Sequence, residues 1–224
     1  MRSSARQRPN PPGFSILELL VVVAVIAIMM SLLAPAVAGF SSTAGRRGAV
    51  NILMNTFEQA RVAALESGQT VYVGFADAEF PLEDMRYAAF IVFRDATDDE
   101  KTADPGRSYV VLKKWTQLPK RVAFKTGTSS LVDGTPKDCS GLSGELGSAL
   151  ASWNEKVPVL AFNSSGAVDQ PSNNLRVFLY EGFFANGKDN ITRNHASQQG
   201  AATLFEQISV SRYTGRAQLD ITSS

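Results

Sequence analysis

The sequence predicts an α+β fold in which one long N-terminal helix packs on antiparallel β-sheets. Three observations support this class. A continuous apolar run at residues 13–34 is followed by a stretch with helical periodicity, and about eight short segments rich in β-branched and aromatic residues come after it. A helix that precedes many strands is typical of α+β domains, in which the helix covers one face of a sheet.

The apolar run contains a single ionisable residue, Glu18. As a helix, residues 14–34 span about 31 Å, which matches the hydrocarbon core of a bilayer at about 30 Å. Residues 1–13 carry three arginines and no acid, so we expect them to stay in the cytoplasm while the rest is exported. A carboxylate inside a membrane costs about 2.5–3.5 kcal/mol at a helix centre, so Glu18 needs a partner.

The helix is expected to continue through residues 35–68. Pro35 and the weakly helical residues 41–45 are expected to kink or fray it. We expect it to end near Ser67, with Gly68 as its C-terminal cap. The apolar positions of this half recur at spacings of three and four and form one stripe that a sheet must cover, namely Val50, Leu53, Met54, Phe57, Ala60, Ala64 and Leu65.

The remainder of the chain is expected to form strands joined by turns. The predicted strands lie at residues 69–75, 86–94, 108–115, 118–124, 157–162, 175–180, 204–210 and 216–221. We expect 157–162 and 175–180 to pair across a Ser-Ser-Gly turn, and the last two strands to form a hairpin. Residues 95–107 and 126–154 are predicted surface loops, the second with a short helix around 146–153.

Composition excludes several classes of protein. The net charge is +1, and because residues 1–13 contribute +3, the remainder carries −2 and gives no case for nucleic-acid binding. The one cysteine, Cys139, rules out an intrachain disulfide, and we expect its thiol to be exposed or half-buried. With a single histidine, His195, a Cys/His zinc site has too few ligands. No serine has the Gly-x-Ser-x-Gly setting of a nucleophile, so no catalytic residue is expected.

The order Gly13-Phe14-Ser15-Ile16-Leu17-Glu18 resembles the processing site of type IV prepilins and pseudopilins. The resemblance implies that prepilin peptidase cuts between Gly13 and Phe14 and that the new N-terminal Phe14 is methylated. Glu18 then becomes the fifth residue of the mature chain. Its charge offsets the terminal amine of a neighbouring subunit during assembly.

Two other interpretations of the N-terminus remain open. An ordinary secretory signal could be cut after the apolar run, where Ala36-Val37-Ala38 fits a small-x-small pattern. The run could also be a signal anchor that is not cut at all. We prefer the prepilin interpretation because neither alternative requires an acid at Glu18.

Further stretches are similar to the H-type minor pseudopilins of type II secretion. They lie at the helix-to-strand junction (residues 57–71), at residues 159–167 and in the final hairpin at 208–217. The combination of residues 58–61 with 70–75 is also similar to the Verru_Chthon cassette protein D group. The resemblance implies a pilin-like fold with a leader at 1–13, a transmembrane and filament-core helix at 14–34, its amphipathic continuation at 35–68 and a periplasmic β-rich domain at 69–224.

Acidic residues cluster in the predicted 95–107 loop, namely Asp95, Asp98, Asp99, Glu100 and Asp104. Hard cations such as calcium favour oxygen-rich loops, and some of the major pseudopilins that this chain resembles bind calcium. The spacing is not that of an EF-hand, and we prefer a solvated loop to a metal site. We expect no cofactor. Arg212 and Arg216 could face DNA, but a solvated hairpin is the preferred interpretation.

The resemblance predicts a minor pseudopilin, which is an assembly component and not an enzyme. It implies a single-pass inner-membrane protein whose C-terminal domain is periplasmic. The expected partners are prepilin peptidase, other pseudopilins or pilins, an inner-membrane assembly platform and membrane lipid, and nucleic acid is not expected. The alternatives are a minor type IV pilin for DNA uptake, adhesion or motility, and a membrane-anchored periplasmic binding module that never polymerises.

Overall fold

A computed structural model describes residues 16–105, 108–127, 129, 131–132, 136–139, 156–170, 175–192 and 205–220, and for residues 32–44 it describes the backbone alone. The chain divides into two compact units, Met1–Ser41 and Ser42–Ser224. The predicted short helix around 146–153 lies outside the described residues.

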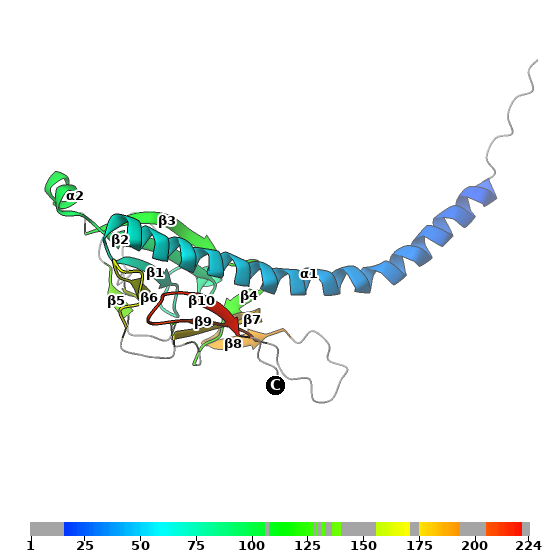
Figure 1. The fold of residues 1–224 in the computed structure, drawn as a ribbon. Coiled ribbons are helices and arrows are strands. Elements are labelled where there is room, and N and C mark those ends of the chain that lie inside the picture. The colour runs from blue at the N-terminus through cyan, green and yellow to red at the C-terminus, as the bar shows by residue number, and fades with distance from the viewer. Residues whose placement is uncertain are drawn as a thin grey trace, which may run out of the picture. The chain divides into compact units, whose positions relative to one another are not determined.

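The described elements are one long helix, one short helix, a single 3₁₀ turn and ten strands (Figure 1). In chain order they are α1 (Ile16–Ser67), β1 (Val71–Phe75), η1 (Glu83–Met85), β2 (Ala89–Asp95), α2 (Asp98–Ala103), β3 (Tyr109–Gln117), β4 (Val122–Phe124), β5 (Pro136–Asp138), β6 (Lys156–Phe162), β7 (Leu175–Ala185), β8 (Lys188–Ile191), β9 (Glu206–Val210) and β10 (Ala217–Asp220). An N-terminal helix with antiparallel strands confirms the predicted α+β class.

Helix α1 ends where the sequence predicted. Its last residue is Ser67, and Gly68 takes the left-handed conformation with φ +67°. The Gly68 N–H donates to the carbonyl of Ala64 at 3.0 Å, as in a glycine C-cap. The expected weak point at residues 41–45 does not end the helix, because α1 continues through it.

The strands form two antiparallel sheets. The first has the order β3-β2-β1-β6-β5, and the second has the order β10-β9-β7-β4 with β8 paired to β7. The predicted hairpin of β9 and β10 is confirmed. The predicted pairing of 157–162 with 175–180 is wrong, because β6 pairs with β1 and β5 while β7 belongs to the other sheet. The Ser-Ser-Gly turn closes only a single bridge from Phe162 to Val168 before the chain crosses between sheets.

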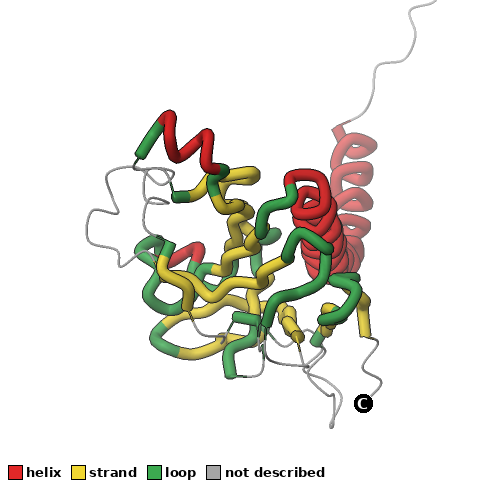
Figure 2. The backbone as a smooth tube through the Cα atoms, turned by 60° about the vertical axis from the view of Figure 1, so that its left-hand side comes forward, coloured by secondary structure: helices red, strands yellow, loops and turns green. Residues whose placement is uncertain are grey.

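The C-terminal half of α1 packs against both sheets, and Figures 1 and 2 show the strands gathered on one side of it. Leu53, Phe57, Ala60 and Ala64 are buried, with inward side chains of β1, β2, β6, β7 and β9 around them. This confirms most of the predicted apolar stripe. Leu65 departs from it, since it is 45% exposed and lies at the edge of the stripe over Gly166.

The outer face of the first sheet carries a second apolar cluster, with Tyr72, Phe93 and Val157 buried in it. Cys139 belongs to this cluster and is completely buried, so the expectation of an exposed or half-buried thiol is wrong. The physical reason is strand β5, which pairs with β6 and brings the residue that follows it onto the sheet. The Cys139 thiol donates to the carbonyl of Lys137 at 3.4 Å.

Candidate functional site

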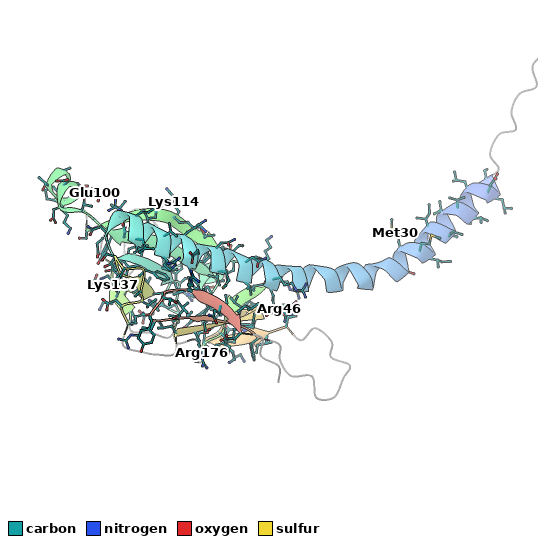
Figure 3. All side chains as sticks on the ribbon, in the orientation of Figure 1. Met30, Arg46, Glu100, Lys114, Lys137 and Arg176 are labelled. Carbon is teal, nitrogen blue, oxygen red and sulfur yellow. The ribbon has the colours of Figure 1, made fainter. Side chains whose placement is uncertain are left out.

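The first part of α1, residues 16–31, has an almost entirely apolar surface. Twelve large apolar side chains between Ile16 and Met30 are 45–85% exposed. Because successive residues are about 100° apart, these side chains point to every side of the helix, as the sticks in Figure 3 show. The amphipathic half of α1, by contrast, buries one stripe and exposes the other.

Glu18 is the one charged side chain on this apolar segment between Ile16 and Ser31, and it is exposed. It lies in the first described turn of α1, where the helix dipole favours a negative charge. Its neighbours one turn ahead, Val21 and Val22, have apolar side chains that offer the carboxylate neither a charge nor a hydrogen bond. Gly13 and Phe14, the predicted processing residues, lie outside the described residues.

A helix that is apolar all round is stable in water only when something covers it, either other protein or lipid. Completing the burial of twelve half-exposed side chains is worth on the order of 10–20 kcal/mol. The same transfer is unfavourable for the Glu18 carboxylate unless a cation or hydrogen-bond donors accompany it. The segment therefore requires a covering surface that also supplies a partner for one carboxylate.

The predicted membrane span of residues 14–34 extends beyond the described side chains at both ends. In the part of the chain that the structure describes, no helix has both the length and the apolar character needed to cross a membrane.

The acidic residues considered for calcium do not converge on one point. Arg94 donates two hydrogen bonds of 2.7 Å to Glu100, and the Tyr72 hydroxyl donates to Asp95 at 3.0 Å. Asp98 lies 3.9 Å from Lys101. Within the described ranges, no three side chains of His, Cys, Asp or Glu are grouped as metal ligands would be.

The acidic segment instead starts helix α2, which the sequence analysis missed. Thr97 and Glu100 form a capping box, in which the Thr97 hydroxyl accepts from the Glu100 N–H and the Thr97 N–H donates to the Glu100 carboxylate at 2.9 Å. The Arg94 hydrogen bonds and the capping bonds lower the pKa of Glu100 to about 2. The signal for this helix was present as the Thr-x-x-Glu spacing.

Of the remaining predicted positions, those that the structure describes are not grouped as metal ligands. His195 lies outside the described residues, and Cys139 is buried. Arg212 and Arg216 flank the β9–β10 turn. The exposed side of α1 carries a shallow groove, lined by Asn55, Glu58, Gln59, Val62, Ala63 and Glu66. Sequence reasoning missed the strong exposure of Tyr213, which the polar residues around the turn at 211–216 could have indicated.

One comparison with known proteins gives a match. The family model of the prokaryotic N-terminal methylation motif matches residues 9–34, which include Gly13, Phe14 and Glu18. No curated protein and no solved structure matches the chain. The motif supports a type IV pilin-like or pseudopilin protein and implies processing by prepilin peptidase and assembly with other pilins. It does not distinguish the H-type or Verru_Chthon groups, whose assignment stays a prediction.

Proposed function

We propose that this chain is a minor pseudopilin, a structural subunit of a type II secretion pseudopilus or a related type IV pilus-like filament. One observation carries the proposal. Within the matched motif at residues 9–34, Glu18 is the one carboxylate, and the large side chains exposed around it between Ile16 and Met30 are all apolar. An apolar helix is sufficient to anchor the chain in a membrane. Anchoring gives no reason for the acid at Glu18, whereas assembly with a neighbouring subunit does.

The proposed sequence of events starts with a single-pass protein of the inner membrane whose C-terminal domain is periplasmic. Prepilin peptidase cuts between Gly13 and Phe14, and the new terminal amine is methylated. The apolar helix then leaves the lipid for the filament core, guided by the inner-membrane assembly platform. The side chains between Ile16 and Met30 stay buried in both states, so the transfer exchanges lipid contacts for contacts with neighbouring helices.

Glu18 makes the free energy of the helix different in lipid and in the filament. In lipid the segment from 14 to 34 offers the carboxylate no lysine or arginine, and its desolvation is unfavourable. In the filament the amine of a neighbouring Phe14 provides the opposite charge, in surroundings where an ion pair is stronger than in water. Pairing therefore favours assembly and fixes the axial register of the two helices.

The ectodomain fits a structural role in this proposal. Its amphipathic helix half and two sheets share a core, and the candidate calcium residues are not grouped as metal ligands among the described residues. We assign it no catalytic role. By resemblance, we propose that it belongs with the H-type minor pseudopilins or with the Verru_Chthon cassette protein D group.

Replacing Glu18 with alanine tests the proposal. We expect Glu18→Ala to leave the urea-unfolding midpoint of the ectodomain unchanged and to reduce incorporation into filaments at least tenfold, as expected if about 1.4 kcal/mol or more of pairing is lost. Sheared filament fractions would be quantified by immunoblot against total membrane protein. Glu66→Ala, which removes an exposed acid from the same helix, is the matched control and should be incorporated normally. Normal incorporation of Glu18→Ala would contradict the proposed role.

A further inference from the structure

The end of the ectodomain where α1 enters carries several exposed basic side chains. Here α1 lies against the turn that leads into β4, since a Cβ added at Gly45 would be 3.7 Å from Val122 and 4.0 Å from the Lys120 carbonyl. Arg47, two residues further along α1, is exposed, and so are Lys120 and Arg121 in the turn. Two segments that are far apart in the sequence therefore bring three cations to one end of the domain.

The β7–β8 hairpin extends from the same end (Figure 1). The Gly182 N–H donates to the Arg121 carbonyl at 2.8 Å, and residues 183–185 of β7 continue past the first residue of β4. Two side chains of this hairpin are exposed, Phe183 by 57% and Lys188. In the strand register, an aromatic side chain thus lies between the cations of the turn and the cation of the hairpin.

The described acidic side chains at this end are engaged within the domain or belong to another segment. The Glu206 carboxylate is 4.0 Å from Arg46, and Asp189 accepts hydrogen bonds of 3.0–3.2 Å from two hydroxyls and one N–H. Glu83 and Asp84 belong to η1, in the excursion between β1 and β2, and Glu83 is 3.5 Å from an arginine of the same turn. The side formed by α1, the turn before β4 and the β7–β8 hairpin is therefore basic.

The same end leads directly to the apolar segment of α1. No charged residue lies between Glu18 and Arg46, so residues 19–45 form an uncharged stretch of 27 residues. As a helix this stretch is about 40 Å long, whereas the hydrocarbon core of a bilayer is about 30 Å thick. A stretch longer than the core is accommodated by tilting, and the first cations after it come to the level of the lipid headgroups. The membrane that holds the helix is therefore the surface within reach of these side chains.

We infer that this surface docks on anionic lipid headgroups of the membrane that holds the apolar helix. We call Arg47, Lys120, Arg121, Phe183 and Lys188 the basic collar. Cations are attracted to an anionic leaflet within a Debye length, about 8–10 Å, and an exposed aromatic ring packs at headgroup depth. The inference rests on the proposed function, and it adds a contact that the ectodomain makes with lipid before the subunit enters a filament.

Quenching of a fluorescent label by lipid in reconstituted vesicles tests the docking with the full chain. The label is attached to Ile191→Cys, which pairs with Gly182 beside the basic collar, in a Cys139→Ala background. The matched control is Ala103→Cys, exposed on α2, which follows the opposite end of β2. In vesicles of phosphatidylcholine and phosphatidylglycerol with a nitroxide on the headgroup, we expect quenching at residue 191 to be stronger than at residue 103 by about threefold or more. Equal quenching at both residues would overturn the inference and would favour an acidic protein as the partner of the basic collar.

Lipid composition and charge removal give a second readout. Vesicles of phosphatidylcholine alone should lower the quenching at residue 191 by about two- to fivefold, and so should Lys120→Gln combined with Arg121→Gln in the anionic vesicles. Phe183→Ser should lower it as well. Lys101→Gln, which removes an exposed cation from α2, is the matched control and should leave the quenching unchanged. If the wild-type collar gives the same quenching with and without phosphatidylglycerol, docking on anionic lipid is wrong.

A label in the apolar helix separates this inference from the proposed function. In the same vesicles, a label on Leu20→Cys and a nitroxide on the lipid acyl chain report insertion of the helix. Insertion without quenching at residue 191 would overturn the inference and leave the membrane anchor standing. Quenching at residue 191 without insertion would support the docking and contradict the single-pass anchor. Absence of both would overturn both.

Discussion

The sharpest prediction from the packing concerns Gly215→Ala. The added methyl group would collide with the backbone carbonyl of Gly166 and approach Arg61 Cδ to 3.0 Å, and the residue sits at φ +64°. A side chain in the left-handed region costs about 1–2 kcal/mol. Forcing a methyl group into a filled space adds about 1–3 kcal/mol. We therefore expect Gly215→Ala to lower the free energy of unfolding by about 2–5 kcal/mol.

Gly187→Ala is the matched control for this prediction. Gly187 has φ +73° but no atom within 4 Å of its added Cβ, so only the backbone term of about 1–2 kcal/mol applies. Urea unfolding of the full chain in detergent, followed by circular dichroism, measures both variants. If Gly215→Ala is no more destabilising than Gly187→Ala, the hairpin is not packed against α1 and the 163–167 turn as described.

Two further predictions concern the core and the short helix. Phe57 is fully buried with its ring 6.4 Å from that of Phe75, so Phe57→Ala should lower the free energy of unfolding by about 3–5 kcal/mol in the same assay, and a loss below about 1 kcal/mol would contradict the assigned core. The pKa of Glu100 is lowered from 4.5 to about 2, so its stabilisation should be complete above pH 4.5 and fade as the pH falls through about 2. The stability difference between wild type and Glu100→Gln, measured at several pH values, should shrink in that window, and a constant difference would contradict the Arg94 pairing.

The sequence predicted those elements whose ends and turns are set by residues adjacent in the chain. Helix α1 was predictable to its last residue because Gly68 marks its end, and the β9–β10 hairpin was predictable from its strand and turn residues. Helix α2 could have been found from the Thr97–Glu100 spacing, but the density of acids favoured a loop. Predicted processing at Gly13 and Phe14 stays a prediction, since neither residue is described.

Strand pairing and burial that depend on contacts between residues far apart in the chain could not be predicted from the sequence. The sequence gives no sign that β6 joins β1 while β7 joins β9, because a short turn and a crossover begin with similar residues. Burial of Cys139 depends on β5, a strand of three residues that has no pattern of its own. The placement of the turn at residues 211–216 against α1 depends on two glycines, Gly166 and Gly215, that lie far apart in the sequence.

The most direct test of the central claim is the intact mass and N-terminal sequence of the membrane-extracted protein, from cells with and without prepilin peptidase. The proposed function predicts a chain that begins at methylated Phe14 only when the peptidase is present. A chain that begins at Gly39, or one that retains Met1 in both strains, would contradict it and remove the basis for assembly through Glu18.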